Sequence, residues 1–206
     1  MPHLLAPTVF TLPDPNGIQH AFYRLPLWGY RLGLGGVLDK FNIAALTTLG
    51  RKSGKPRFAA LEYRQHGSKI YIISGWGEQA NWVRNLEQHP QVTLRRGVRV
   101  QAGRAAVVSD RNEVFRALTL FYRTNPAAYE RMFKRLSQRD SMDALTLPQI
   151  ADRVLVVRVL PEAGPPVLPA APTDGQRAAA VAAGALLALL VTGLFAFALG
   201  RSRRSR

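Results

Sequence analysis

The chain has 206 residues, with 28 Lys and Arg against 13 Asp and Glu, and it contains no cysteine. This length allows one domain of ordinary size with an appendage. A hydrophobic fraction of 47% is enough for a core, which excludes a chain that is disordered throughout. The lack of cysteine excludes a disulfide scaffold, cysteine-ligated zinc, iron–sulfur clusters and a cysteine nucleophile.

The positive charge is divided between two parts of the chain. Residues 177–206 carry five arginines and no acidic residue, which leaves a net charge of +10 on residues 1–176. Such a surplus predicts an anionic partner, namely a phosphorylated small molecule, nucleic acid or anionic lipid.

Residues 1–160 are expected to form a single domain of short strands and a few helices. One or two short helices are expected within 22–38, and further helices at 81–88, at 110–123 and from 125 onward. Strands are expected at 44–49, 58–64, 69–74, 91–96, 98–108 and 153–160, with a hairpin turn at 65–68. This order predicts the α+β class, with a small antiparallel barrel of about six strands and flanking helices.

The C-terminal part of the chain has a different composition. Residues 161–177 include five prolines and two glycines, which is typical of an extended, unpacked linker. The 22 residues 178–199 carry no charge, and as a helix they would extend roughly 33 Å, enough to cross a bilayer. We therefore expect a transmembrane helix at 178–200 and a basic tail at 201–206. The alternative is a buried helix.

The orientation of this membrane anchor follows from two conflicting arguments. Four arginines follow the span and only Arg177 directly precedes it, which by the positive-inside rule places the tail in the cytoplasm. No N-terminal segment resembles an export signal. We give the second argument more weight and expect a membrane-anchored protein with a cytoplasmic body.

A basic segment lies between the first two expected strands. It reads Gly50, Arg51, Lys52, Ser53, Gly54, Lys55, Pro56, Arg57. Its four cations, hydroxyl group and flexible glycines can hold a phosphate through side chains and backbone N–H groups. The spacing is not that of a P-loop, and a strand follows it. The alternative is a solvated hairpin tip.

A second segment combines glycine and tryptophan between a strand and a helix. The expected strand ends at Ser74, and Gly75 and Gly77 flank Trp76 directly after it. The two glycines permit close approach of a flat ligand. The first amides of the helix that begins near Asn81 can bind an anion. The alternative for Trp82 is a place in the core.

No arrangement of acid–base residues stands out in the chain. The four histidines show no metal-ligand spacing, and we expect no bound metal. No Ser/His/Asp set or carboxylate pair is apparent. If the protein is an enzyme, a cofactor is therefore expected to carry the chemistry.

The two segments together resemble the deazaflavin-dependent nitroreductase and quinone reductase family. The likeness covers residues 23–108 and rests on Leu-Thr-Thr followed by Gly-Arg-Lys-Ser-Gly-x-Pro-Arg, and on Ser-Gly-Trp-Gly-x-x-x-x-Trp-x-x-Asn-Leu before a His-Pro turn. It implies a split β-barrel that binds coenzyme F-420, a deazaflavin with a phosphodiester and a glutamate tail.

The resemblance also implies which residues contact the cofactor. By position they are Thr47, Thr48, Arg51, Lys52, Ser53, Gly54, Lys55, Arg57, Ser74, Gly75, Trp76, Asn81, Trp82, Arg84 and Asn85. The implied reaction is hydride transfer from reduced F-420 to a quinone, nitro or activated alkene acceptor. Tyr122, Tyr129 or solvent would supply the proton. A lipid-soluble acceptor such as a quinone would suit a membrane-anchored protein.

Two other functions stay open at this point. The barrel could bind FMN or heme, although the basic segment offers more cations than a single phosphate needs. The protein could also be a non-enzymatic, membrane-anchored module that binds a cofactor, anionic lipid or nucleic acid. Nucleic acid is disfavoured because Trp76 and Trp82 are not spaced as a stacking stripe along strands.

Overall fold

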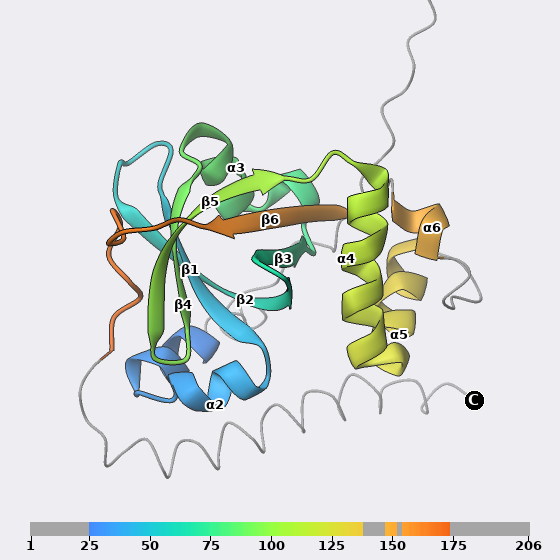
Figure 1. The fold of residues 1–206 in the computed structure, drawn as a ribbon, viewed down its shortest axis with the longest axis horizontal. Helices are drawn as coiled ribbons and strands as arrows, with labels where there is room; N and C mark the ends of the chain where they lie inside the picture. The colour runs from blue at the N-terminus through green and yellow to red at the C-terminus, as the bar shows by residue number, and fades with distance from the viewer. Residues whose placement is uncertain (1–24, 138–146, 152–153, 174–206) are drawn as a thin grey trace, which may run out of the picture.

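A computed structural model describes residues 25–137, 147–151 and 154–173 (Figure 1). Within these ranges no helix combines the length and the apolarity that a membrane span requires. The transmembrane helix expected at 178–200 and the basic tail at 201–206 lie outside the described residues.

Six antiparallel strands form a closed barrel in the order β1-β2-β3-β6-β5-β4. The strands are β1 (Ile43–Leu49), β2 (Pro56–His66), β3 (Lys69–Ser74), β4 (Gln91–Arg96), β5 (Arg99–Val107) and β6 (Leu155–Pro161). Pairing of β1 with β4 closes the barrel. The expected α+β barrel of about six strands is therefore confirmed.

Apolar side chains at alternate positions along the strands fill the barrel interior. Leu46, Ile72, Leu94 and Val157 are fully buried and belong to one hydrophobic cluster. Because successive side chains on a strand point to opposite faces, every second residue along each strand points into the barrel. Burial of this cluster holds the six strands together.

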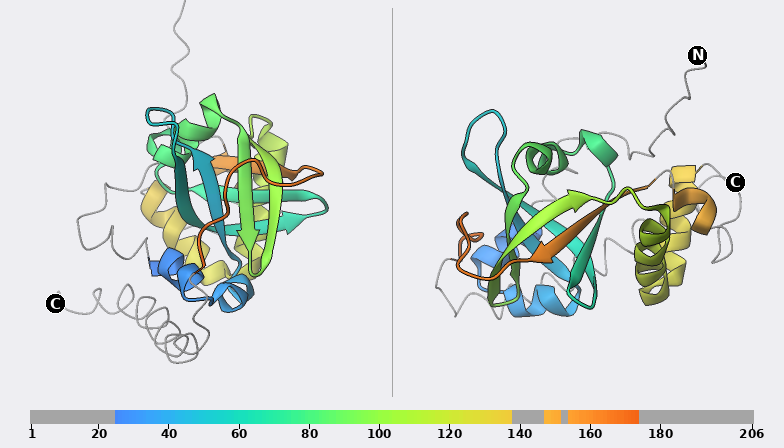
Figure 2. Two further views of the ribbon diagram at one scale, coloured as in Figure 1. Left: turned by 90° about the vertical axis from the view of Figure 1, so that its left-hand side faces the viewer. Right: turned by 45° about the horizontal axis from the view of Figure 1, so that its top comes forward.

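The helices lie at different sides of this barrel (Figures 1 and 2). Residues 25–31 are helical and precede α2 (Gly35–Lys40), while η1 (Gly77–Gln79) and α3 (Asn81–Gln88) follow β3. Helices α4 (Arg111–Thr124), α5 (Pro126–Ser137) and α6 (Leu147–Ile150) lie together on one side. The carboxylate of Asp110 accepts a hydrogen bond from the Asn112 N–H at 3.0 Å and thereby caps the N-terminus of α4.

Strand β2 is longer than its sequence pattern indicated. It begins at Pro56, two residues before the expected start, and it continues to His66. Pairing of Leu49 with Pro56 and of Thr48 with Arg57 extends the β1–β2 ladder to the base of the loop. Pro56 is tolerated at this position because it is the first residue of the strand. The basic loop is therefore 50–55, and Arg57 is a strand residue.

The proline-rich segment after β6 packs against the barrel, so the expectation that it is unpacked is wrong for its described residues. The Leu168 carbonyl accepts a hydrogen bond from Thr93 Oγ1 at 2.7 Å, and the Ala171 carbonyl accepts one from Arg95 Nη1 at 2.7 Å. Ala171 is 2% exposed and packs with Tyr30. Proline content marks an extended chain but does not reveal that its carbonyls have partners.

Candidate functional site

The loop 50–55 is closed by hydrogen bonds to both backbone groups of Gly50. Its N–H donates to the Lys55 carbonyl at 2.9 Å, and its carbonyl accepts from the N–H groups of Ser53 and Gly54 at 3.1 and 2.8 Å. A Cβ at position 50 would lie 2.8 Å from Ser53 Oγ and 3.0 Å from the Lys55 carbonyl oxygen. Glycine at this position therefore permits the tight loop that carries Arg51 and Lys52.

Helix α3 places two asparagines next to this loop. Val83 and Leu86 are buried against the barrel core, which fixes the rotation of the helix. Asn81 and Asn85 are four residues apart and therefore share one face of α3. That face is turned toward Arg51, which forms hydrogen bonds to both asparagines.

Arg51 is held by α3 through its backbone and its side chain. The Arg51 N–H and Nη1 donate to Oδ1 of Asn85 at 3.1 and 3.3 Å, and Nη1 also donates to Oδ1 of Asn81 at 3.2 Å. Asn85 Nδ2 in turn donates to Oγ1 of Thr48 on β1 at 3.1 Å. The two segments that sequence analysis singled out are thus joined directly.

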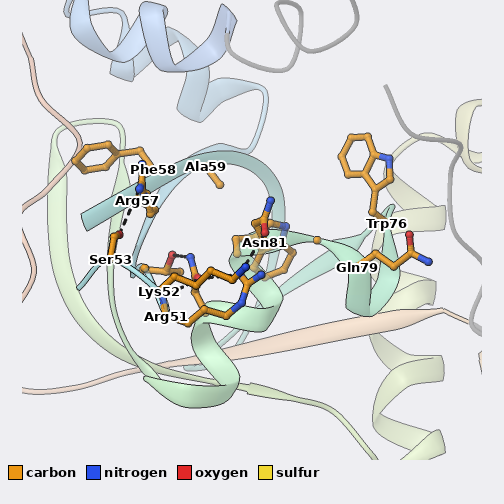
Figure 3. Close-up of a pocket in the computed structure, with 14 residues that line it drawn as sticks. Arg51, Lys52, Ser53, Arg57, Phe58, Ala59, Trp76, Gln79 and Asn81 are labelled. Carbon is orange, nitrogen blue, oxygen red and sulfur yellow. Dashed lines mark hydrogen bonds between the residues drawn. The ribbon is translucent and has the colours of Figure 1, made fainter. Parts of the chain in front are cut away.

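These contacts border a cavity of about 570 Å³. Figure 3 shows Arg51, Lys52, Ser53 and Arg57 on one side of it and Trp76 with Gln79 on the other, while Asn81 lies between them. The full lining is Thr48, Gly50, Arg51, Lys52, Ser53, Arg57, Phe58, Ala59, Trp76, Gln79, Ala80, Asn81, Trp82 and Asn85. One side is therefore cationic and the other is largely apolar and aromatic.

The charge of this cavity has one sign. Its lining includes three cations, from Arg51, Lys52 and Arg57, and no Asp or Glu is among the lining residues, all of which lie in the described part of the chain. Arg57 Nη2 donates to Oγ of Ser53 at 3.3 Å, which holds this cation against the loop. Such a surface attracts an anion with several negative groups.

Nine of the fifteen residues that the resemblance assigned to the cofactor line this cavity. They are Thr48, Arg51, Lys52, Ser53, Arg57, Trp76, Asn81, Trp82 and Asn85. The other six, which are Thr47, Gly54, Lys55, Ser74, Gly75 and Arg84, are not part of its lining.

Three of the residues outside the lining have structural explanations. Thr47 follows the alternation of β1 and points to the face opposite Thr48. Ser74 is buried, and its Oγ donates to the Gly77 carbonyl at 2.8 Å, which shapes the turn after β3. Arg84 is exposed on α3, and its Nε donates to the Glu78 carbonyl at 3.0 Å.

The two tyrosines expected near the acceptor lie in the packing of α4 and α5 and do not line the cavity. Tyr122 donates from its hydroxyl to Oε1 of Glu130 at 2.7 Å. Tyr129 is 6% exposed and packs edge-on against Phe121. Burial, together with the charge of Glu62, raises the pKa of the Tyr129 hydroxyl. Both side chains are thus engaged in the contact between helices.

Sequence reasoning missed five lining residues, namely Gly50, Phe58, Ala59, Gln79 and Ala80. Gly50, Gln79 and Ala80 stand inside the two motifs, so their position between assigned residues was an available signal. Phe58 and Ala59 follow Arg57 on β2, and only the pairing of β2 with β1 brings them to the cavity.

The fold and the cavity together define a class of protein: a six-strand barrel with a cavity that is cationic on one side and aromatic on the other. Among the described residues no group of three or more His, Cys, Asp or Glu side chains could hold a metal ion. The donor set, with cations facing tryptophans, suits an organic anion.

The family model of the F-420H(2)-dependent quinone reductases matches residues 23–139, which is more than half of the chain. The chain therefore belongs to this family and is an F-420H2-dependent reductase. The family implies the deazaflavin cofactor, and the match gives no support to FMN.

Several solved structures are similar to the chain at low identity. A reductase dependent on F-420-H2 (FDR-A) is 21% identical, with 57% of this chain and 93% of that chain covered and a TM-score of 0.42. The heme storage protein HutZ from Vibrio cholerae is 17% identical, with 65% and 92% covered and a TM-score of 0.44. A NimC/NimA family protein from Clostridium acetobutylicum is 17% identical, with 60% and 76% covered and a TM-score of 0.39.

Proposed function

We propose that the chain binds reduced F-420 in the cavity between the loop 50–55 and α3 and passes its hydride to a quinone. The observation that carries this proposal is that the cationic loop and the tryptophan segment line the same cavity. When bound, F-420H2 supplies the hydride.

The cationic side of the cavity suits the anionic part of the cofactor. Arg51, Lys52 and Arg57 would hold its phosphodiester and tail carboxylates, because charged N–H donors bind such oxygens strongly. Asn81 and Asn85 already fix the side chain of Arg51 before the anion binds, so little side-chain entropy is lost on binding.

The aromatic side of the cavity suits the ring and the acceptor. Trp76 and Trp82 pack partly against the barrel core and leave part of their surface to the cavity. They would orient flat rings and exclude water from the reacting atoms, which favours hydride transfer between them.

Protonation of the reduced acceptor is assigned to solvent. None of the cavity-lining residues, all within the described ranges, is a carboxylic acid, histidine or tyrosine. The side chains of Tyr122 and Tyr129 serve the contact of α4 with α5 instead.

Turnover with different acceptors tests this proposal. The full chain is mixed with F-420H2 and with a menaquinone analogue, a nitroaromatic compound or an activated alkene, and oxidation of the deazaflavin is followed by absorbance. We expect the highest kcat/KM with the quinone. Higher kcat/KM with the nitro compound or the alkene would assign the acceptor class differently, and no oxidation with any of them would contradict the proposal.

The membrane anchor is a separate proposal. The uncharged segment 178–199 supports it, and a lipid-soluble quinone would be accessible to a protein anchored in this way. Fractionation of cells that express the full chain tests it, because an anchored protein stays in the membrane pellet after washing with alkaline carbonate. Release by the wash would contradict the anchor.

A further inference from the structure

We propose that Asn85 is a positioning residue that acts on the cofactor through Arg51. This inference rests on the proposed function, since it assigns Arg51 to the anionic part of F-420. The sequence resemblance placed Asn85 among the residues that contact the cofactor. The hydrogen bonds of its amide indicate a different role.

The amide of Asn85 is engaged at both ends. Its oxygen accepts two hydrogen bonds from Arg51, and its nitrogen donates to Oγ1 of Thr48. The orientation of the amide is fixed, because an NH2 group in place of the oxygen would face two N–H donors. Asn85 is 3% exposed and Arg51 is partly buried, so loss of these bonds would leave partly buried donors of Arg51 without this acceptor.

The kind of hydrogen-bond acceptor at position 85 determines whether the positive charge of Arg51 stays available to a ligand. A carboxylate at position 85 would also accept from Arg51, but it would form an ion pair and cancel the charge that an anionic ligand needs. Asparagine provides the same acceptor geometry without a charge. Asn81 likewise offers Arg51 a neutral amide oxygen as hydrogen-bond acceptor.

The contacts also select which part of the guanidinium group stays available. Both asparagines accept from Nη1 of Arg51. Among the described residues, no hydrogen bond from Nε or Nη2 of Arg51 accompanies these. Since a guanidinium presents its donors in a rigid fork, fixing one nitrogen fixes the direction of the others. Asn85 also binds the Arg51 backbone N–H, so both the loop and the side chain are held.

A double-mutant cycle on the full chain tests whether Asn85 acts through Arg51. The Kd for F-420 is measured by fluorescence titration for the wild type, Asn85→Ala, Arg51→Ala and the double variant. We expect each single substitution to weaken binding about tenfold, the scale of one charged hydrogen bond. Adding Asn85→Ala to Arg51→Ala should weaken binding less than Asn85→Ala does in the wild type, because only the bond to the backbone N–H of residue 51 is then lost. Equal weakening by Asn85→Ala in both backgrounds would overturn the proposal.

A charge variant gives a second, independent readout. Asn85→Asp keeps an acceptor for Arg51 but adds a negative charge, so we expect weaker F-420 binding and a smaller dependence of Kd on salt concentration than in the wild type. Wild-type affinity and salt dependence in Asn85→Asp would contradict the inference. If circular dichroism shows that Asn85→Ala does not fold, the Kd and salt dependence of Asn85→Asp test the inference in its place.

Failure of the inference differs from failure of the proposed function. A folded wild-type chain that does not bind F-420 overturns both. Wild-type binding combined with additive effects in the cycle overturns only the role of Asn85. Asn81→Ala serves as the comparison, because it removes one acceptor of Nη1 and leaves the Arg51 backbone bond intact, so we expect a smaller loss of affinity than for Asn85→Ala.

Discussion

Nη1 of Arg158 on β6 donates to Oε2 of Glu113 on α4 at 2.6 Å and thereby ties the barrel to the helices beside it. The same carboxylate accepts from Lys69 Nζ at 2.9 Å and from the Tyr71 hydroxyl at 2.8 Å, both on β3. Glu113 is 5% exposed. A single buried carboxylate therefore links α4 to two strands.

Replacing this carboxylate should destabilise the fold. In Glu113→Gln, Lys69 and Arg158 lose their charged partner, so we expect the free energy of unfolding at neutral pH to fall by about 3 kcal/mol. Urea denaturation followed by circular dichroism measures the change. A loss under about 1 kcal/mol would show that the cluster contributes no more than exposed ion pairs do.

The stability that Glu113 provides should depend on acid pH. Burial by itself raises the pKa of this carboxyl, but the hydrogen bonds from Lys69, Tyr71 and Arg158 outweigh it and lower the pKa from 4.5 to about 2. The folded state then binds fewer protons than the unfolded state, so the stabilisation is complete above pH 4.5 and is lost as pH falls toward 2. The difference in unfolding free energy between wild type and Glu113→Gln should shrink over this interval. A constant difference would contradict the lowered pKa.

A methyl group at position 50 should disturb the site more than the fold. The Cβ of Gly50→Ala would come within 3.0 Å of the Lys55 carbonyl oxygen, so the loop must shift and carry Arg51 with it. We expect at least about tenfold weaker F-420 binding, equivalent to one charged hydrogen bond. Gly36→Ala is the matched control, because nothing lies within 4 Å of its Cβ and α2 gains a better helix former. Equal Kd values in the two variants would contradict the role of the loop.

Short-range signals explain what the sequence predicted well. The limits of β3, α3 and β4 agree with expectation, and the turn glycines Gly67 and Gly97 have φ values of +58° and +56°. Turn chemistry of this kind depends on neighbouring residues only. The shared cavity agrees with what the resemblance implied, since it assigned residues of both motifs to one cofactor.

Long-range packing explains what the sequence left out. Phe58 and Ala59 border the cavity because β2 pairs with β1 as far as Leu49 and Pro56, and no local pattern encodes that register. Thr47 and Thr48 are equivalent by composition, and only their opposite faces on β1 separate them. Tyr122 and Tyr129 of α4 and α5 do not line this cavity, since helix packing determines which face each of them presents.

Two arginines that the resemblance assigned to the cofactor should differ in their effect on its binding. Arg57 lines the cavity, whereas Arg84 donates to the Glu78 carbonyl outside it. We expect Arg57→Ala to weaken F-420 binding about tenfold, and Arg84→Ala to change it less than about twofold. Fluorescence titration in one buffer compares them. A larger effect of Arg84→Ala would support the assignment by resemblance over the observed geometry.

The hydroxyl of Tyr122 should be dispensable for turnover. It donates to Glu130 between α4 and α5, so Tyr122→Phe should lower the free energy of unfolding by about 1 kcal/mol while kcat stays within about twofold of wild type. Steady-state oxidation of F-420H2 with a quinone measures kcat. A loss of kcat above tenfold without loss of stability would restore Tyr122 as a proton donor.

The measurement that tests the account most directly is the affinity of the folded full chain for F-420, with and without the cations of its loop. The wild type should quench or shift the deazaflavin fluorescence on binding. The Arg51→Ala/Lys52→Ala variant should bind at least about tenfold more weakly, because two charged donors to the anionic tail are gone. The same Kd for both proteins, or no binding by the wild type, would contradict the claim that this cavity holds the cofactor.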